Sequence, residues 1–281
     1  MYIGIIGNGF VGKATSLLHS KNTNLIVYDI IPELCKPIKV ELKTFNFCDI
    51  IFLCLPTPMN KNGSCHTDIL EEMVYNLKKF INFDEKIVII RSTVPVGTSD
   101  NLNCYFFPEF LTEKNYLQDF VNNQNWIFGL KNNKQDIIFK KKITELINLA
   151  YQNNNIKCNN IEFILNSEAE MVKLFRNSFL ATKLSFCNEM YEFCKKKNID
   201  YDIVKDIAVK DKRIGKSHTD VPGSDSKTGF GGICLPKDMN SLLFQMNEVY
   251  MNSYIIKASI NRNNYKDRKD KDWQQSGRSI I

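Results

Sequence analysis

The stretch GFGGICLPKD at residues 229–238 places one cysteine, Cys234, between a run of glycines and a predicted helix start. Pro236 is typical of the first turn of a helix, which would put Cys234 just before that helix. A helix N-terminus stabilises a thiolate, and Lys237 adds positive charge. Glycines have no side chain, so a substrate carbon can come close to the sulfur. The pattern favours a nucleophilic thiol over a buried, inert one.

Three further polar residues have a spacing that suits chemistry near such a thiol. Asp238 lies four residues beyond Cys234, where it could orient a water molecule or pair with a lysine; a first-turn acid that complements the helix dipole is the alternative. Lys173 and Asn177 are spaced i, i+4 in a predicted helix, so they share one face. Together they could donate hydrogen bonds to a developing oxyanion, although a solvated helix face would show the same spacing.

The sequence GNGFVG at residues 7–12 follows the first apolar run and supplies Gly7, Gly9 and Gly12. The first glycine permits a tight turn, the second lets the backbone approach a pyrophosphate, and the third lets a helix pack closely. Asp29 ends the second predicted strand, 17 residues after Gly12, where its carboxylate can accept the ribose hydroxyls and would repel a 2′-phosphate. The motif therefore predicts dinucleotide binding, with NAD favoured over NADP.

These residues need a scaffold, and the first part of the chain alternates short apolar runs with helical patterns. The predicted strands lie in residues 2–6, 25–29, 49–55 and 86–92, and a helical stretch covers residues 69–80. Continuous apolar strands that alternate with helices indicate an α/β fold with a Rossmann-type parallel sheet. Two proline-containing loops, Pro56–Pro58 and Ser92–Pro95, should open at the carboxyl edge of that sheet, where ligands of such folds bind.

The pattern changes after residue 165. A stretch without Gly or Pro from Ser167 to Lys197 predicts one long helix, on which Cys187 and Cys194 should pack in the core. Its recurring apolar residues predict a broad buried face: Met171, Leu174, Phe175, Phe179 and Phe186. We expect a helix over roughly 236–250 and a solvated tail held by Trp273. The chain is thus divided into an NAD-binding Rossmann-type domain, 1–166, and an all-helical domain, 167–281, built on the long helix.

Composition excludes several other classes. The chain has 281 residues, 43% of them hydrophobic, and its net charge of +6 comes from scattered lysines, which argues against a nucleic-acid partner. No apolar run approaches the ~20 residues of a membrane helix, and the start lacks the features of a signal peptide. The nine cysteines contain no CxxC pair, and there are three histidines, so we expect reduced thiols, no metal site and a cytoplasmic protein.

Taken together, several segments resemble the UDP-glucose 6-dehydrogenase family, in order and over nearly the whole chain. They are GNGFVG, RSTVPVGT (91–98), FPEFLTE (107–113), KLFRNSFLATKLSFCNE (173–189), RIG (213–215) and GFGGICLPKD. The resemblance implies a four-electron oxidation of UDP-glucose to UDP-glucuronate with two NAD⁺ in succession. Cys234 would attack the intermediate aldehyde, and the thiohemiacetal would be oxidised to a thioester that water hydrolyses.

The resemblance also assigns residues to roles. Lys173 and Asn177 would stabilise oxyanions, Asp238 would act with them on a water molecule, and Glu109 would serve in acid/base steps or thioester hydrolysis. Thr93 would lie beside the nicotinamide, and Arg213 would reach the substrate across the interface of a homodimer formed through the long helix. The implied cofactor-binding residues are Gly7, Gly9, Phe10, Val11, Gly12, Asp29, Pro56, Thr57, Thr93, Glu113 and Lys237. The implied substrate-binding residues are Glu109, Phe110, Leu111, Lys173, Asn177, Arg213 and Gly231.

The sequence departs from the family pattern in ways that concern the substrate. About 30 residues follow the last predicted helix, so we expect a short form without the family's third, UDP-binding domain. A dehydrogenase of another nucleotide sugar, GDP-mannose or a UDP-N-acetylhexosamine, is the nearest alternative. A two-electron β-hydroxyacid dehydrogenase that uses Lys173 and Asn177 without the thiol is another, and a non-catalytic binding protein is a third.

Overall fold

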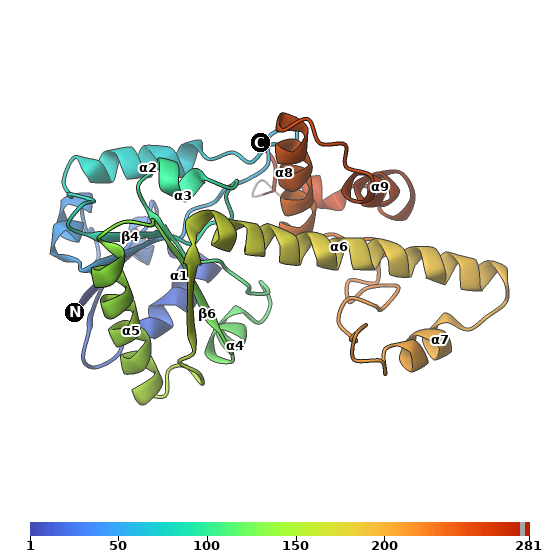
Figure 1. Cartoon of the computed structure of the whole chain (residues 1–281), viewed down its shortest axis with the longest axis horizontal. Coiled ribbons are helices and arrows are strands. Elements are labelled where there is room, and N and C mark those ends of the chain that lie inside the picture. The colour runs from blue at the N-terminus through green and yellow to red at the C-terminus, as the bar shows by residue number, and fades with distance from the viewer. Residues whose placement is uncertain (276–278) are drawn as a thin grey trace. The chain divides into compact units, whose positions relative to one another are not determined.

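The computed structural model describes residues 1–275 and 279–281, and the chain forms two compact units. Unit 1 comprises residues 1–57 and 67–173, and unit 2 comprises residues 58–66 and 174–281. Figure 1 shows the elements of both units with the labels used below.

A seven-stranded sheet forms the centre of unit 1 in the described part of the chain, in the order β2-β1-β3-β4-β5-β6-β7. Its strands are β1 (Tyr2–Ile6), β2 (Asn24–Tyr28), β3 (Ile50–Leu53), β4 (Ile87–Ile90), β5 (Tyr105–Phe106), β6 (Trp126–Leu130) and β7 (Ile161–Leu165). Neighbouring strands are parallel except β5 and β6, which are antiparallel. The predicted Rossmann-type sheet is confirmed, and one reversed pair is added to it.

Helices connect the strands of unit 1 and form most of unit 2. They are α1 (Phe10–Thr15), α2 (Asp68–Lys78), α3 (Thr98–Asn101), α4 (Tyr116–Val121), α5 (Asp136–Gln152), α6 (Asn166–Lys196), α7 (Tyr201–Ala208), α8 (Cys234–Glu248) and α9 (Ile255–Arg262). Short 3₁₀ turns lie at η1 (Ser16–Leu18), η2 (Pro32–Leu34), η3 (Leu42–Phe47) and η5 (Asp272–Gln275), and a π turn lies at η4 (Asn263–Asp267). The long helix α6 confirms the one predicted over Ser167–Lys197 to within one residue at each end.

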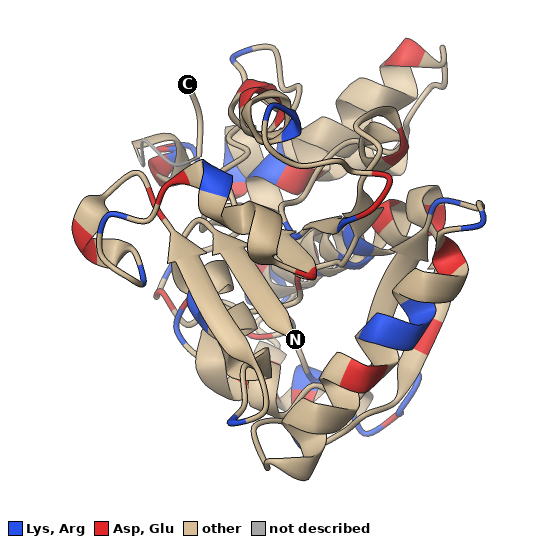
Figure 2. Ribbon diagram, turned by 90° about the vertical axis from the view of Figure 1, so that its left-hand side faces the viewer, with Lys and Arg blue, Asp and Glu red and all other residues tan. Residues whose placement is uncertain are grey.

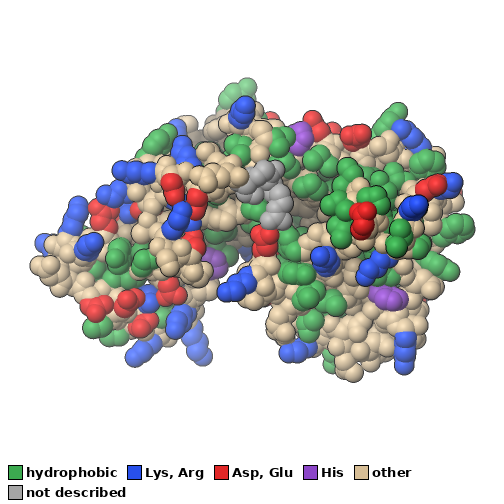
Figure 3. Space-filling model, turned by 180° about the vertical axis from the view of Figure 1, so that it is seen from behind, with side chains coloured by type: hydrophobic (Ala, Val, Ile, Leu, Met, Phe, Trp, Pro, Cys, Tyr) green, Lys and Arg blue, Asp and Glu red, His purple; other side chains and the backbone are tan. Residues whose placement is uncertain are grey.

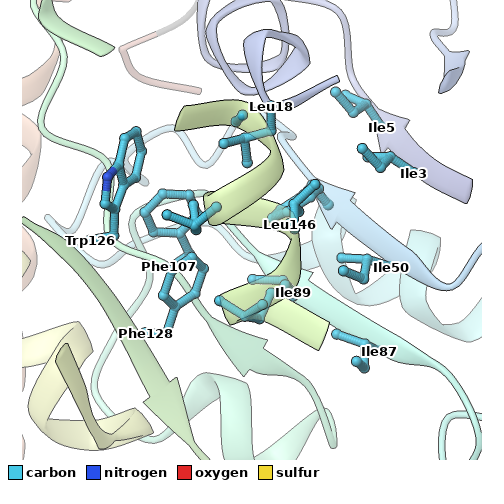
Figure 4. Close-up of a cluster of buried hydrophobic side chains, with 14 of the residues drawn as sticks. Ile3, Ile5, Leu18, Ile50, Ile87, Ile89, Phe107, Trp126, Phe128 and Leu146 are labelled. Carbon is cyan, nitrogen blue, oxygen red and sulfur yellow. The ribbon is translucent and has the colours of Figure 1, made fainter. Parts of the chain in front are cut away.

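Both faces of the sheet are buried, which explains why its strands read as continuous apolar runs. Alternate strand residues, such as Ile5 and Ile50, pack on one face against α1, α4 and α5, as the close-up in Figure 4 shows in part. Their neighbours, such as Ile6 and Ile51, pack on the other face against α2 and the start of α6. Figure 1 shows α2 on one side of the sheet and α5 on the other.

Unit 2 contains two smaller apolar clusters. One joins α6 to α8 and α9 through Ala181, Met239 and Ile260, and the other joins the end of α6 to α7. Cys187 and Cys194 lie in the second cluster, each 7% exposed, so their predicted burial is confirmed. Asp200 caps α7 by accepting hydrogen bonds from the backbone N–H groups of the first turn.

The predicted buried face of α6 is wrong for most of its members. Leu174 is buried, but Met171 is 36% exposed, Phe175 63%, Phe179 60% and Phe186 62%. The prediction of a solvated tail is also wrong in part, because Asn263 and Arg268 are buried, whereas the burial of Trp273 agrees with its predicted role of holding the tail. A helical period shows which residues share a face, but not whether the same chain covers that face.

Charged side chains are distributed without separation by sign. The ribbon in Figure 2 and the face drawn in Figure 3 both show Lys and Arg interspersed with Asp and Glu. Of the helices described here, none combines the length and apolar character that a bilayer crossing requires.

Candidate active site

In the glycine-rich turn between β1 and α1, two of the three glycines occupy positions where a side chain would not fit. Gly7 has a φ of +94°, and a Cβ there would lie 2.4 Å from the carbonyl oxygen of Cys54 in the loop after β3. A Cβ on Gly12 would lie 1.9 Å from the carbonyl oxygen of Gly7. A Cβ on Gly9 would meet no atom within 4 Å, so the space above that residue is open. The turn therefore leaves room for a ligand at the start of α1.

Asp29 follows β2 directly, and its carboxylate is held by backbone groups. Oδ2 accepts a hydrogen bond from the Asn8 N–H at 2.7 Å, and Oδ1 accepts one from the Ile31 N–H at 3.0 Å. The carboxylate is thus fixed beside the glycine turn, at the edge where the sheet order reverses between β1 and β3. An open Gly9, backbone N–H groups at the helix start and a fixed acid all fit a dinucleotide with free ribose hydroxyls.

Two more loops leave the carboxyl ends of β3 and β4, as predicted, and they are joined to each other. The Thr57 hydroxyl donates to the Thr93 carbonyl oxygen at 2.7 Å, and the Ser92 hydroxyl donates to the Leu55 carbonyl oxygen at 2.5 Å. Pro56 is exposed and Thr93 is half-buried. β3 is parallel to β1 and β4 is parallel to β3, so both loops lie at the same sheet edge as the glycine turn.

Unit 1 also contains a buried ion pair between two of the predicted catalytic residues. The Lys173 Nζ lies 3.2 Å from Glu109 Oε2, and the side chains are 4% and 7% exposed. The other oxygen of Glu109 accepts a hydrogen bond from the Leu111 N–H, and the Lys173 ammonium lies 5.9 Å from the centre of the Phe110 ring. The sequence named both residues for separate roles, and the structure brings them into contact.

Arg91 supports the segment that carries Glu109, and sequence reasoning did not identify it. Its guanidinium stacks 3.6 Å from the centre of the Phe107 ring and donates to the carbonyl oxygens of Phe107 and Pro108. Burial lowers the pKa of Arg91 to about 10, which still leaves it charged near neutrality. Arg91 could have been identified from the sequence, because an arginine directly after a buried apolar strand is unusual.

Glu170, one turn before Lys173 on α6, was also missed. Its two carboxylate oxygens accept hydrogen bonds from the N–H groups of Gly97, at 2.6 Å, and Ser99, at 2.8 Å. Burial raises the pKa of Glu170, although these N–H groups favour the ionised form. The carboxylate therefore joins the loop after β4 to the helix that carries Lys173.

In unit 2, Cys234 is the first residue of α8, not a residue just before it. The helix starts two residues earlier than Pro236 predicted, because Ile233 already occupies the N-cap position and Pro236 is in the first turn. Cys234 is half-buried. A first-turn sulfur lies close to unsatisfied backbone N–H groups, which favour a thiolate.

Asp238, the other predicted residue of this helix, is fully buried and has two partners. Its Oδ2 accepts from the Asn177 side-chain amide at 2.6 Å, and its Oδ1 accepts from the Lys237 ammonium at 2.7 Å. Burial opposes the charged form of Lys237, but the Asp238 carboxylate and, more weakly, the thiols of Cys65 and Cys234 hold its pKa above the ordinary value. The lysine that pairs with Asp238 is therefore its sequence neighbour, and the Asn177 amide is fixed by the same carboxylate.

The other predicted residues are located as follows. Phe10 packs edge-on against Tyr116 at 6.2 Å between ring centres, Val11 is half-buried on α1 and Glu113 is exposed. The Arg213 side chain is 90% exposed and forms an ion pair with Asp211. Their proposed roles remain predictions.

Two glycine substitutions should separate folding from dinucleotide binding in unit 1. Gly12→Ala forces a Cβ against a backbone oxygen, so we expect a loss of stability of about 3 kcal/mol or more, and with it the loss of NAD binding. Gly9→Ala meets nothing in the protein, so its melting temperature should stay that of the wild type while NAD affinity falls. Thermal melting and NAD titration of both variants check this. Equal melting of the two variants would contradict the packing argument.

Comparison with known proteins places this geometry in a family. Residues 37–151 match the model described as the UDP-glucose/GDP-mannose dehydrogenase family, NAD binding domain, and residues 167–265 match its central domain. The UDP-glucose 6-dehydrogenase of Campylobacter jejuni is 31% identical over 94% of this chain and 72% of its own length. The chain belongs to the UDP-glucose/GDP-mannose dehydrogenase family. The match to the family's NAD binding domain indicates that the cofactor is NAD.

For other relatives in the family, the match covers only part of the relative's length. The UDP-glucose 6-dehydrogenase of Rickettsia bellii is 30% identical over 76% of this chain and 49% of its own length, so the chain spans about half of such relatives. The fold is similar to that of a UDP-glucose dehydrogenase from Pyrobaculum islandicum (TM-score 0.78, 22% identity, 94% of this chain and 68% of that one). A UDP-D-ManNAc dehydrogenase from Pyrococcus horikoshii is also similar (TM-score 0.74, 21% identity, the same coverage).

Proposed function

We propose that this family member oxidises UDP-glucose to UDP-glucuronate, a four-electron reaction that passes through a covalent bond to Cys234. The observation that carries the proposal is the position of Cys234 as the first residue of α8, half-buried, one turn from a buried Asp238 that is bonded to Asn177. A two-electron dehydrogenase needs no thiol at a helix N-terminus. The half-exposed sulfur in that position favours the covalent route over the β-hydroxyacid alternative.

The first oxidation requires an acceptor for a hydride and donors for the oxygen that is left behind. Bound NAD⁺ would supply the hydride acceptor, twice for each acid formed. The Lys173 ammonium and the Asn177 amide, one turn apart on α6, would donate hydrogen bonds to the substrate oxygen as it gains negative charge. The alcohol proton would leave through a water molecule held by Asp238, and Glu109, within 3.2 Å of the Lys173 ammonium, would act later, in hydrolysis.

Cys234 then makes the second oxidation possible. Its thiolate would add to the aldehyde carbon, forming a C–S bond, and the carbonyl oxygen would take up a proton to give a thiohemiacetal. Loss of a hydride and of that proton gives a thioester. Water attacks the thioester carbon, the C–S bond breaks, and the thiolate is regenerated as the acid forms. The covalent bond keeps the aldehyde from escaping between the two oxidations.

Two carboxylates are available for the hydrolysis step, and their surroundings suggest different roles. Asp238 is fully buried with an ammonium and an amide bound to its two oxygens, so it suits the orientation of Asn177 and of a water molecule. Glu109 has one lysine and one backbone N–H as partners and suits proton transfer.

The nucleotide and the sugar follow from the relatives, not from a contact in the structure. The family description names both UDP-glucose and GDP-mannose, and the C. jejuni and R. bellii relatives are UDP-glucose 6-dehydrogenases. We therefore propose UDP-glucose, with GDP-mannose and UDP-N-acetylhexosamines as the competing substrates. Comparing kcat/KM over these nucleotide sugars decides among them.

The stoichiometry of NADH tests the reaction itself. With purified protein, NAD⁺ and limiting UDP-glucose, we expect two NADH for each UDP-glucose consumed and one UDP-glucuronate formed. One NADH per UDP-glucose would contradict the four-electron reaction. NAD binding without turnover of any nucleotide sugar would instead favour a non-catalytic binding protein.

We further propose that a second copy of the chain covers the exposed aromatic stripe of α6. Phe179, Phe186 and Phe193 are each more than half exposed and seven residues apart, and Phe175 stacks parallel to Phe179 at 6.4 Å between ring centres. A seven-residue spacing keeps such residues on one line along a helix, which suits pairing with another helix. Arg213, exposed in the same unit, would then reach the partner's substrate.

The dimer proposal predicts that a charged residue in the aromatic stripe lowers the molecular mass of the protein in solution. Phe179→Glu should convert the dimer to a monomer in size-exclusion chromatography with light scattering, because a buried unpaired carboxylate opposes association. Phe47→Glu, at a phenylalanine of unit 1 that is 71% exposed and outside the stripe, is the matched control and should stay dimeric. A monomeric wild type, or a dimeric Phe179→Glu variant, would contradict the proposal.

A further inference from the structure

The glycine loop ahead of Cys234 is held by buried side chains of unit 2 that the proposed chemistry does not use. The Gly229 N–H donates to Asn188 Oδ1 on α6 at 3.0 Å. The Phe230 N–H donates to Asn263 Oδ1 at 2.8 Å, and the Asn263 amide donates back to the Phe230 carbonyl oxygen at 2.9 Å. Asn263 is fully buried, so both of its polar groups are used on one residue of the loop.

Arg268 is the second contact to the loop, at the position of Gly231. A Cβ on Gly231 would lie 2.3 Å from Cζ of Arg268, so the guanidinium packs directly on the glycine backbone. The Arg268 side chain is 4% exposed, and its guanidinium is held by Asp272, with Nε to Oδ1 at 2.7 Å, and by Asp225. Burying a charged group is costly without such partners, so two acids are committed to keeping the guanidinium in place.

Asn263 and Arg268 leave no space for side chains at two of the loop glycines. These glycines are therefore needed for this packing as well as for the approach of a substrate. Gly229 has a φ of +73°, and a Cβ there would lie 2.3 Å from Asn263 Oδ1. Gly232 has a φ of +71° and lies two residues before Cys234. The backbone from Gly229 to Gly232 therefore has little freedom to move while Asn263 and Arg268 stay in place.

Asn263 and Arg268 reach the loop from the π turn η4. The Arg268 N–H donates to the Asn263 carbonyl oxygen at 2.8 Å, a bond between residues five apart that closes this turn. Wide turns of this kind change the direction of side chains at the end of a helix and occur often at functional sites. Here the turn directs two side chains at one loop.

We propose that Asn263 and Arg268 are positioning residues that fix the backbone of Gly229–Gly232 and, through it, the direction of the Cys234 sulfur. The inference rests on the proposed function in so far as Cys234 is the nucleophile. It adds that the thiol is aimed by a segment some 30 residues further along the chain. Neither residue touches the reacting atoms in this account.

Two variants and two readouts test the proposal. Asn263→Ala removes both hydrogen bonds to Phe230, and Arg268→Lys keeps the charge but loses the planar fork that packs on Gly231. Asn261→Ala and Lys269→Ala, at exposed residues on either side, are the matched controls. The first readout is the rate of iodoacetamide labelling of Cys234, followed on its peptide by mass spectrometry. The second is kcat with UDP-glucose, with NAD affinity and melting temperature measured beside it.

A released loop should expose the sulfur and misdirect it. We therefore expect Cys234 to label several-fold faster in Asn263→Ala and Arg268→Lys, while kcat falls about 10- to 100-fold and NAD affinity stays unchanged. Labelling and kcat equal to those of the controls would overturn the proposal, as would a fall in kcat matched by loss of NAD binding and melting temperature. If the wild type forms no acid, the proposed function fails, and the labelling rates alone decide the role of the two residues.

Discussion

Cys234→Ser should abolish the formation of UDP-glucuronate while NAD binding and the melting temperature stay those of the wild type. An alcohol at the start of α8 is not ionised near neutrality, so it cannot form the adduct through which the second oxidation passes. We expect the rate of acid formation to fall by about 10³-fold or more. The yield of NADH should fall from two to no more than one per UDP-glucose. The stability should be unaffected, because Cys234 is half-buried and the hydroxyl is smaller than the thiol.

A second cysteine substitution is the control for this result. Cys187→Ser changes a buried cysteine of α6 in the same unit and should cost stability without changing the NADH stoichiometry. Undiminished acid formation by Cys234→Ser would exclude the covalent route and favour a reaction that uses Lys173 and Asn177 alone. The NADH yield is measured by absorbance, and the formation of UDP-glucuronate by separation of the nucleotide sugars.

Lys173→Ala should damage both folding and catalysis. The variant leaves the Glu109 carboxylate, 7% exposed, without its cationic partner, which costs about 3–5 kcal/mol for a buried pair. It also removes a donor to the substrate oxygen, for which a loss of about 10²- to 10³-fold in kcat is expected. Urea unfolding and steady-state kinetics measure the two effects separately.

A double substitution distinguishes the two effects of Lys173. Lys173→Met together with Glu109→Gln removes both charges, so stability should recover while activity stays lost. Lys142→Ala is the matched control, since the ion pair of Lys142 with Asp49 is about one third exposed and should contribute no more than about 1 kcal/mol. If Lys173→Ala unfolds at the same urea concentration as Lys142→Ala, the ion pair with Glu109 does not stabilise unit 1.

Much of unit 1 could be predicted from the sequence because its strands are buried on both faces. The runs at residues 2–6 and 86–92 contain β1 and β4, and the glycine turn lies where the motif placed it. The reversed pair of β5 and β6 could not be predicted, because β5 has only two residues, Tyr105 and Phe106. A strand that short has no period, and its direction is set by the chain around it.

The exposed phenylalanines of α6 show a second limit. Phe175 and Phe179 recur with the helical period, which predicts burial, yet both are exposed in the single chain. The period is the same whether the covering surface comes from this chain or from another copy. Only the structure separates Leu174, which is buried, from its neighbour Phe175.

The candidate site was predictable where a residue stands in a motif and not where it supports one. Cys234 and Glu109 lie in distinctive segments, so the sequence alone singles them out as candidates. Asn263 and Arg268 lie in a tail rich in Asn, Lys and Asp, in which no spacing marks them as buried. Their burial results from contacts with a loop some 30 residues earlier, and local sequence patterns do not predict contacts between distant segments. For Asp238, the sequence predicted pairing with a lysine as one alternative but did not show that the partner is the neighbouring Lys237.

The most direct test of the central claim is to look for substrate carbon on the Cys234 sulfur. The wild type and a Glu109→Gln variant, in which slower hydrolysis should let the thioester accumulate, are mixed with NAD⁺ and UDP-glucose and quenched in acid. Mass spectrometry of the peptides then reports the adduct. We predict that the peptide with Cys234 gains the mass of a UDP-glucuronyl group, to a greater extent in the variant. Formation of UDP-glucuronate with that peptide unmodified in both proteins, or modified at another cysteine, would contradict the account.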